Sequence, residues 1–182
     1  MTAKYQVPRT PPRLPILARA AKKSQIFFER PGSPTAGFCA RGDLGAQLGS
    51  RVVISTEQWI ERYGRAWETG DADEIVDLFT PDASYRSSVF REPYLGRDAI
   101  RAYWQRGAGA QREVAVVMGR PVVAGDRVAV EWWTTMIDPD EGELTLPGCL
   151  LLRFAPDGRC QDLWEYWQTR PGRQDPPAGW GS

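Results

Sequence analysis

The chain contains no histidine, and this absence removes the side chain that most often shuttles protons near neutral pH and most often binds transition metals. Lysine is confined to the first 23 residues, so the remaining sequence has no amine nucleophile for Schiff-base chemistry. The three cysteines, Cys39, Cys149 and Cys160, have neither C-x-x-C spacing nor a histidine partner, which argues against zinc and Cys–His sites. We therefore expect no metal and no cofactor, and any chemistry must rest on carboxylates, tyrosines or arginines.

Long apolar runs and nucleotide-binding loops are also missing. No stretch approaches the roughly 18 apolar residues that a membrane span needs, so we expect no membrane association. Neither G-x-G-x-x-G nor G-x-x-x-x-G-K-[ST] occurs, which argues against the usual nucleotide loops. The sparse, odd number of cysteines fits reduced thiols, and we expect a cytoplasmic protein.

The net charge of zero conceals two oppositely charged parts. Residues 1–51 carry nine basic and two acidic residues, whereas the rest carries fourteen basic and twenty-one acidic residues. An acidic body repels nucleic acid, so we expect no nucleic-acid partner. The first segment is rich in proline, glycine and arginine, and we expect 1–51 to be a disordered basic tail or an upstream extension of the reading frame. Residues 52–170 form the expected domain, and the Gly/Pro-rich residues 171–182 are expected to be a flexible end.

Three short helices are predicted in the first half of this domain. Ser55 and Gln58 form a capping box for the first helix, which ends at Gly70. The second and third helices are expected over Ala72–Phe79 and Ala99–Arg106. An apolar stripe at helical spacing supports the first helix and consists of Trp59, Tyr63, Ala66 and Trp67.

Extended segments dominate the second half. A first strand is expected from Ala83, and the later valine- and aromatic-rich runs are separated by short turn signals such as Asp157-Gly158. The expected later runs are Glu113–Val123, Arg127–Ile137, Leu144–Phe154 and Arg159–Thr169. Helices followed by an antiparallel meander predict an α+β fold in which one strongly curved, mostly antiparallel sheet wraps around the three helices.

The order of these elements and several short motifs resemble the nuclear transport factor 2-like superfamily, and within it the SnoaL-like and ketosteroid isomerase-like branch. The resemblance covers about Thr56 to Arg170. The motifs are Glu61-Arg62-Tyr63, Gly70-Asp71, Asp82-Ala83-Ser84, Gly96-Arg97-Asp98-Ala99-Ile100, Val130-Glu131-Trp132-Trp133, Leu152-Arg153-Phe154, Asp157-Gly158-Arg159 and Glu165-Tyr166-Trp167. This resemblance implies a conical α+β barrel with one deep, mostly apolar pocket, often in a homodimer. It does not imply one reaction, because this fold hosts many activities.

The residues that match the catalytic positions of the isomerases do not preserve their chemistry. Tyr63 stands where those enzymes place a tyrosine that donates a hydrogen bond to the developing enolate. Ser87 stands at the position of their proton-shuttling aspartate, and Leu150 at the position of the protonated aspartate that is their second donor. A serine without a neighbouring base does not remove a proton from carbon at a useful rate. We therefore expect no steroid isomerase activity by the usual Asp/Asp/Tyr mechanism.

The match to limonene-type epoxide hydrolases, which share the fold, is also partial. Glu165 stands where their last-strand carboxylate would lie. Tyr85 and Ser87 resemble their Tyr-x-Asn pair with serine in place of asparagine. Their Arg-x-Asp pair aligns with Trp132 and Thr134, so the second carboxylate and its arginine are absent. The resemblance therefore allows epoxide hydrolysis only in an altered form.

The last strand also indicates an interior carboxylate without reference to any family. Alternation puts Glu165 and Trp167 on one face, so an inward Trp167 implies an inward Glu165. Desolvation among tryptophans would raise the pKa of Glu165 and suit it to a role as acid, base or polar anchor. The structural alternative is an ion pair of Glu165 with Arg65 or Arg153. A buried tyrosine such as Tyr63 would likewise find some partner for its hydroxyl in a purely structural role.

Tryptophan is unusually frequent in the expected domain and supplies candidate pocket walls. Most of these rings are expected to form the core, and we expect Trp67, Trp104, Trp132 and Trp167 to face the pocket. With Ser87, Thr134 and Leu150, they form the predicted pocket lining around the catalytic candidates Glu165, Tyr63 and Tyr85. Aromatic residues on both faces of the later strands predict a second subunit on the outer face, and hence a homodimer.

Three functions remain open from the sequence. The first is a SnoaL-like protein that binds an apolar small molecule, with or without acid–base chemistry of the isomerase, cyclase or hydrolase type. The second is an altered epoxide hydrolase in which Glu165 activates water. The third is a non-catalytic module for dimerisation or partner binding, whose interior is filled by its own side chains.

Overall fold

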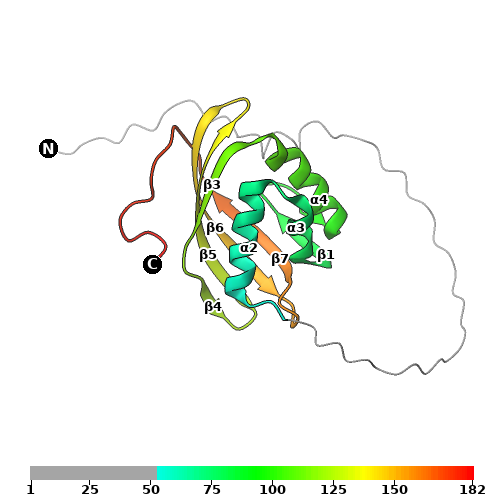
Figure 1. The fold of residues 1–182 in the computed structure, drawn as a ribbon. Coiled ribbons are helices and arrows are strands. Elements are labelled where there is room, and N and C mark those ends of the chain that lie inside the picture. The colour runs from blue at the N-terminus through cyan, green and yellow to red at the C-terminus, as the bar shows by residue number, and fades with distance from the viewer. Residues whose placement is uncertain (1–52) are drawn as a thin grey trace, which may run out of the picture.

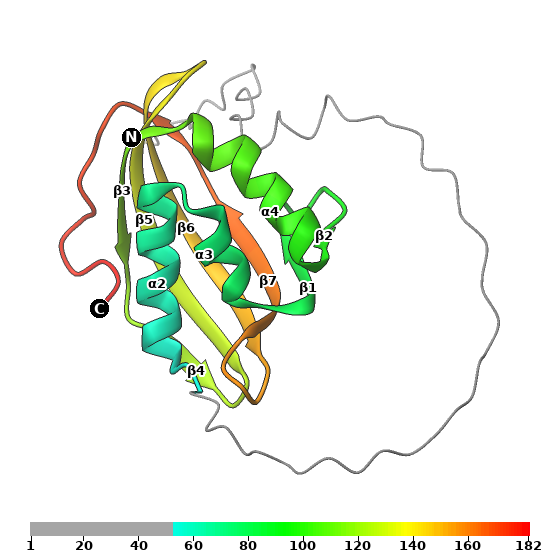
Figure 2. The same cartoon turned by 45° about the vertical axis from the view of Figure 1, so that its right-hand side comes forward.

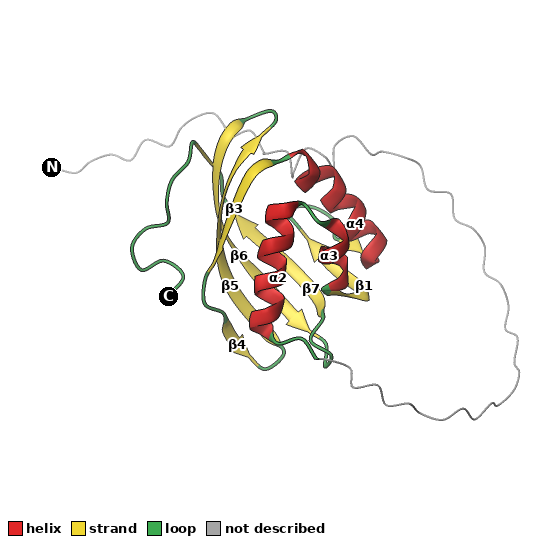
Figure 3. Cartoon of the chain, in the orientation of Figure 1, coloured by secondary structure: helices red, strands yellow, loops and turns green. Residues whose placement is uncertain are grey.

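The computed structural model describes residues 53–182, so the expectations for residues 1–51 lie outside the described residues. In chain order its elements are α2 (Thr56–Thr69), α3 (Ala72–Asp77), β1 (Phe79–Arg86), β2 (Tyr94–Leu95), α4 (Gly96–Gly107), the 3₁₀ turn η2 (Ala108–Ala110), β3 (Arg112–Met118), β4 (Val122–Ala124), β5 (Arg127–Asp138), β6 (Gly142–Phe154), β7 (Cys160–Trp167) and β8 (Arg170–Pro171). Figure 1 shows the described helices on one side of a curled sheet, and Figure 3 shows the same division by element type.

The predicted α+β architecture is confirmed. The sheet has the order β2-β1-β7-β6-β5-β3, with β4 beside β5 and β8 beside β6. All the described pairings are antiparallel except β1 with β7, which is parallel. The sheet curls around the helices, as Figure 2 shows from a second direction, but it is not closed into a barrel, since β2 and β3 end its strand order.

Local chemistry explains where the first helices begin and end. The Ser55 hydroxyl accepts a hydrogen bond from the Gln58 backbone, and the Gln58 side chain accepts one from the Ser55 backbone, which completes the predicted capping box. Gly70 ends α2 in the left-handed conformation, with φ of 68°. The Asp71 side chain then accepts hydrogen bonds from the first backbone amides of α3 at 2.9 and 3.0 Å.

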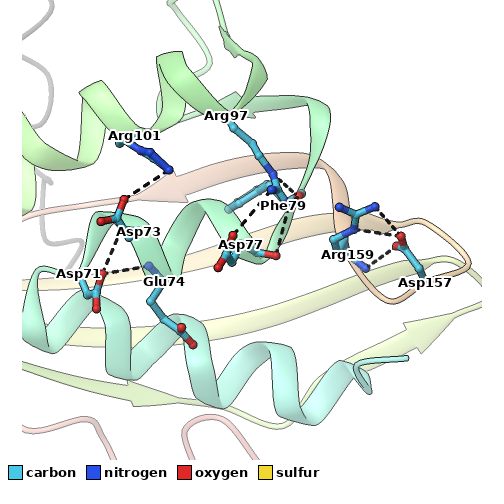
Figure 4. Close-up of polar contacts among 9 residues, drawn as sticks. All are labelled: Asp71, Asp73, Glu74, Asp77, Phe79, Arg97, Arg101, Asp157 and Arg159. Atoms are coloured by element: carbon cyan, nitrogen blue, oxygen red, sulfur yellow. Dashed lines mark hydrogen bonds and ion pairs between the residues drawn. The ribbon is translucent and has the colours of Figure 1, made fainter. Parts of the chain in front are cut away.

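The first strand begins earlier than the sequence suggested, because Phe79 belongs to β1 and not to α3. The β1–β7 register shifts between Phe79 and Ser84, an interval that contains Pro81, which has no amide hydrogen to donate to the sheet. Figure 4 shows how Arg97, at the start of α4, donates to the Phe79 carbonyl at 2.9 Å, while Arg101 pairs with Asp73 at 3.3 Å. These contacts hold α4 against α3 and the beginning of β1.

The core lies between the helices and the inner face of the sheet. Its largest fully buried side chains are aromatic: Trp59, Tyr63, Phe79, Tyr85, Tyr103 and Trp132. Each such ring buries about 150–250 Å² and dominates the packing energy around it. The Tyr63 ring stacks on the Trp59 ring, with centroids 5.0 Å apart, and this contact holds the Tyr63 side chain of α2 in place in the interior.

The C-terminal segment, expected to be a flexible end, contacts the outer side of the sheet. The Trp133 indole donates to the Gln174 carbonyl at 2.8 Å, and the Trp180 ring lies 5.8 Å from the Trp133 ring. Figure 1 shows this segment beyond β3 and β5, away from α4.

Gly148 offers a test of how tightly the interior is packed. A Cβ atom at this position would lie 2.4 Å from the ring of Trp132, which is buried directly opposite on β5. We expect Gly148→Ala to lower the free energy of unfolding by about 1–3 kcal/mol, measured by chemical denaturation. The control is Gly109→Ala, where the added Cβ meets no atom within 4 Å, and we expect a change within about 0.5 kcal/mol. Equal stability of the two variants would contradict the packing described here.

Candidate functional site

Glu165 lies inside the domain because of its position on β7. Along this strand Leu163 and Glu165 are buried, whereas Trp164 and Tyr166 are exposed by 39% and 45%. Because successive side chains of a strand point to opposite faces of the sheet, the Glu165 carboxylate points into the aromatic core. β7 lies between β1 and β6 in the sheet, so the side chain has ordered strands on both sides.

Two tyrosine hydroxyls meet the Glu165 carboxylate. Tyr85 of β1 donates to Oε1 at 2.7 Å, and Tyr63 of α2 donates to the same oxygen at 3.2 Å. The two hydroxyls lie 3.1 Å apart. Three elements that are distant in sequence therefore converge on one carboxylate oxygen, and we refer to Tyr63, Tyr85 and Glu165 as the carboxylate cluster.

The carboxylate cluster does not include the arginines considered as structural partners of Glu165. Arg65 pairs with Glu61 at 3.7 Å, and Arg153 pairs with Asp162 on the outer face of the sheet. Burial without a described cationic partner disfavours the charged carboxylate and raises the pKa of Glu165 from its ordinary value of 4.5 to about 7. The hydrogen bonds from Tyr85 and Tyr63 stabilise the carboxylate and offset part of this rise in pKa.

The tyrosines themselves remain neutral donors. Burial raises the pKa of Tyr63 and of Tyr85 well above the ordinary value of 10, and the nearby Glu165 raises both further. Glu165 is therefore the group in the cluster that exchanges a proton near neutral pH.

A small cavity adjoins the carboxylate cluster. Its lining consists of Trp67, Tyr85, Tyr103, Trp104, Ala108 and Glu165. The volume open to the centre of a water molecule is about 10 Å³, which is room for about one water. Aromatic rings therefore leave little open space in this cavity. A second, larger groove of about 550 Å³ is lined by Glu165 and by the predicted wall residue Trp167.

The other predicted wall residues are buried or half-buried and do not line this cavity: Ser87, Trp132, Thr134, Leu150 and Trp167. Leu150 stands opposite Glu165 in the β6–β7 register. The Trp167 indole donates to the Ser87 carbonyl at 3.0 Å, which fixes the end of β7 against the loop that follows β1. Trp132 and Thr134 are fully buried, and neither the Trp132 Nε1 nor the Thr134 Oγ1 has a hydrogen-bond partner.

Sequence reasoning missed Tyr103 and Ala108 as residues of the site. Tyr103 is buried, and its ring lies 5.3 Å from that of Tyr85. Burial raises the pKa of the Tyr103 hydroxyl well above its ordinary value, and the charge of Glu165 raises it further. In the predicted third helix, Ile100, Tyr103 and Trp104 are spaced so that they share one apolar side, so the inward direction of Tyr103 was foreseeable. The position of Ala108 depends on how η2 follows α4, and no motif indicates that turn.

The described residues offer little for metal or thiol chemistry. Between residues 53 and 182 no group of three or more potential metal-binding side chains comes together. Burial raises the pKa of both Cys149 and Cys160, which keeps these thiols protonated. Within the same range, no helix has the length and apolar character of a membrane span.

Comparison with known proteins agrees with the fold described above. The family model described as a SnoaL-like domain matches residues 60–163. Among solved structures, the epoxide hydrolase/cyclase-like enzyme SalBIII, studied for pyran ring formation in the polyether salinomycin, is 26% identical with a TM-score of 0.54, and the match covers 62% of this chain and 89% of SalBIII.

Two further solved structures show the fold alone. A protein with a ketosteroid isomerase-like fold from Catenulispora acidiphila, in complex with trimethylamine, is 20% identical with a TM-score of 0.56, and the match covers 62% of this chain and 86% of that one. A protein from Shewanella denitrificans, described by its similarity as a SnoaL-like polyketide cyclase, is 18% identical with a TM-score of 0.55, and the match covers 62% of this chain and 89% of that one. The predicted nuclear transport factor 2-like fold is therefore confirmed.

The raised pKa of Glu165 predicts a specific pH dependence of stability. Below about pH 4.5 the folded and unfolded chains both hold the proton, and as the pH rises towards 7 the unfolded chain loses it first. The stability that Glu165 contributes is therefore present at low pH and is lost as the pH rises through about 7, by about 3 kcal/mol in total.

Chemical denaturation at a series of pH values measures this loss. Glutamine does not titrate, so the free energy of unfolding of Glu165→Gln should not show this decrease as the pH rises. The difference between wild type and Glu165→Gln at each pH therefore gives the contribution of Glu165 alone. Parallel curves for Glu165→Gln and wild type between pH 5 and pH 8 would contradict a buried, titrating Glu165.

The two tyrosines should differ in their effect on Glu165. We expect Tyr85→Phe to raise the pKa of Glu165 further than Tyr63→Phe does, because Tyr85 makes the shorter hydrogen bond, 2.7 Å against 3.2 Å. The measurement is the pH midpoint of the stability loss, which should move upwards in both variants and more in Tyr85→Phe. An unchanged midpoint in Tyr85→Phe would show that its hydroxyl does not stabilise the carboxylate.

Proposed function

The chain belongs to the SnoaL-like family, and on that premise we propose that it binds a small, largely apolar molecule with an oxygen function and exchanges a proton with it through Glu165. The observation that carries this proposal is the carboxylate cluster, in which a buried Glu165 with a pKa of about 7 accepts hydrogen bonds from two neutral tyrosines. A general acid or base works best when its pKa lies near the operating pH. An ordinary core position gives no reason to bury a carboxylate in this way.

The reaction is of the isomerase, cyclase or hydrolase type, and ring opening of an epoxide illustrates the proton balance. Neutral Glu165 gives its proton to the epoxide oxygen while the carbon–oxygen bond breaks. A hydroxyl of the same molecule, or a water, forms the new bond to carbon and returns its proton to the Glu165 carboxylate. The first case is a cyclisation and the second a hydrolysis. The likeness to SalBIII, an epoxide hydrolase/cyclase-like enzyme, supports this class of chemistry.

Binding requires that the rings around the cavity move. The cavity beside the carboxylate cluster holds about one water, so an organic molecule fits into it only if side chains such as Trp104 or Tyr103 turn away. A more open groove of about 550 Å³ is also lined by Glu165, together with Trp167. Three buried donors without partners, Trp104 Nε1, Trp132 Nε1 and Thr134 Oγ1, are available to a ligand oxygen once the interior opens. Unsatisfied buried donors are costly, and a bound oxygen would relieve that cost.

A second candidate function is a non-catalytic module for dimerisation or partner binding. The specific observation in its favour is the small cavity beside the carboxylate cluster, which has room for about one water. In that case the carboxylate cluster is a hydrogen-bonded element of the core.

Tryptophan fluorescence separates the two candidates. Titration of the protein with steroids, polyketide-like aromatics and terpene epoxides should give saturable quenching with at least one class, because Trp67 and Trp104 line the cavity. A folded protein that shows no response to any of these molecules would favour the non-catalytic module.

Turnover of a molecule that binds then tests the role of Glu165. We expect Glu165→Gln to lower kcat by about 10²–10⁴-fold while binding persists, since glutamine keeps the size of the side chain but not its exchangeable proton. The matched control is Glu61→Gln on the exposed side of α2, which should leave kcat unchanged. Equal turnover by wild type and Glu165→Gln would exclude the acid–base role.

A further inference from the structure

The groove of about 550 Å³ beside the end of β7 is lined by aromatic rings from three separate segments. Phe90 belongs to the loop that follows β1, Tyr166 and Trp167 belong to β7, and Trp180 belongs to the C-terminal segment. We refer to it as the aromatic groove. Phe90 and Tyr166 are exposed by 95% and 45%. Large apolar side chains that gather and remain this exposed usually mark the binding site of a partner.

Contacts with the rest of the domain hold the walls of the aromatic groove in place. The Trp167 indole donates to the Ser87 carbonyl at 3.0 Å, which ties β7 to the start of the loop that carries Phe90. Trp180 packs against the Trp133 ring, and the next residue, Gly181, accepts a hydrogen bond from the Arg120 amide at 2.7 Å. The aromatic groove is therefore preformed, so a partner would not have to order its walls.

The aromatic groove is also acidic. Glu131 and Glu165 line it, and no arginine or lysine among the described residues does so. The Glu131 side chain is exposed, and within residues 53–182 no ion pair joins it to a basic side chain. Exposed aromatic rings bind proline-rich segments in the polyproline II conformation, and a carboxylate beside them favours a segment that also carries arginine.

The chain itself contains a segment with this chemistry. Residues 8–15 read Pro-Arg-Thr-Pro-Pro-Arg-Leu-Pro and contain two P-x-x-P spacings. A polyproline II helix has three residues per turn, so residues three apart share an edge. One edge of these residues is apolar, a second is apolar after Arg9, and Arg13 lies on the third. The apolar residues are Pro8, Pro11 and Leu14 on the first edge and Pro12 and Pro15 on the second.

We propose that residues 8–15 bind in the aromatic groove of the same chain as a polyproline II helix. The prolines lie against Phe90, Tyr166 and Trp180, and Arg13 lies beside Glu131. The connection through residues 16–52 can span up to about 120 Å, whereas a domain of this size is about 35 Å across. This inference does not depend on the proposed chemistry of Glu165.

Charge and tethering favour this occupant over others. Residues 1–51 carry nine basic and two acidic residues, and the rest of the chain has an excess of acidic residues. A tether of this length gives residues 8–15 an effective concentration on the order of 1 mM at the aromatic groove. A proline-rich segment of another protein would have to reach a comparable concentration in solution to displace it.

Trypsin cleavage of the folded full chain tests whether the segment is bound. We expect the double variant Phe90→Ala/Tyr166→Ala to be cleaved after Arg13 about tenfold faster than wild type, which corresponds to an effective concentration about ten times the dissociation constant. Cleavage after Arg19, outside residues 8–15, is the internal reference and should not change.

The matched control is Leu95→Ala/Trp164→Ala, which removes two other exposed apolar side chains outside the aromatic groove. This control should be cleaved after Arg13 at the wild-type rate. Circular dichroism and thermal unfolding establish that both variants are folded. Equal cleavage after Arg13 in wild type and in Phe90→Ala/Tyr166→Ala would overturn the proposal.

Dilution distinguishes binding within one chain from binding between copies. The protection of Arg13 should be independent of protein concentration, because the tether sets the effective concentration. Protection that falls on dilution would place the segment, or a second copy as a whole, on a neighbouring molecule and would overturn the proposed contact within one chain.

A synthetic peptide of residues 7–16 tests the occupant directly. In a full-chain variant whose four prolines at positions 8, 11, 12 and 15 are changed to alanine, the aromatic groove should be free and the peptide should bind saturably, as measured by isothermal titration calorimetry. Wild type should bind the peptide about tenfold more weakly, because its own segment competes. Equal affinity of the peptide for the two proteins, or no binding to either, would overturn the proposal.

The same titration tests the ion pair. Glu131→Gln in the proline-free variant and Arg13→Gln in the peptide should each lower the affinity by about two- to fivefold, as expected for an exposed ion pair, and together by no more than either alone. Fully additive losses would overturn the assignment of Arg13 to Glu131.

Discussion

The contact on which the interior depends is that of two tyrosine hydroxyls with one buried carboxylate. Glu165 comes from β7, Tyr85 from β1 and Tyr63 from α2, so the cluster joins the helical layer to two neighbouring strands. Desolvation destabilises the charged carboxylate, and the hydrogen bonds from the two tyrosines offset part of this effect. The resulting balance sets the pKa of Glu165 at about 7, where small changes in its surroundings decide its charge.

The aromatic packing around this contact explains why the two tyrosine hydroxyls are held in place and why the cavity beside Glu165 is small. Trp59 stacks on Tyr63, and Tyr103 contacts Tyr85, so each donor hydroxyl is held by a neighbouring ring. The same rings, with Trp67 and Trp104, occupy the space in which a ligand would lie. Under the proposed function, a ligand would displace some of the rings that hold the tyrosine hydroxyls in place, and its contacts would have to compensate for the contacts that are lost.

Successive residues of β7 point to opposite faces of the sheet and therefore have different surroundings. Its inner residue Glu165 belongs to the carboxylate cluster, whereas Trp164 and Tyr166 are exposed on the opposite face of the sheet. A register shift of one residue would exchange the buried and the exposed residues of β7. The pairing of β7 with both β1 and β6 fixes that register.

Local patterns in the sequence determined the helices, most strand positions and the inward direction of Glu165, because capping, turn chemistry and a period of two act over a few residues. They did not place Phe79 in β1, since the parallel pairing with Cys160 that holds it there is a contact between distant segments. They also proposed Trp132 and Trp167 as pocket walls without showing that other rings fill the space beside Glu165. Tyr103 and Ala108 join that site only through the packing of α4 and η2 against the sheet. The volume left inside the domain and the single oxygen shared by Tyr63 and Tyr85 were decided by the tertiary structure, because both depend on distances between residues far apart in the chain.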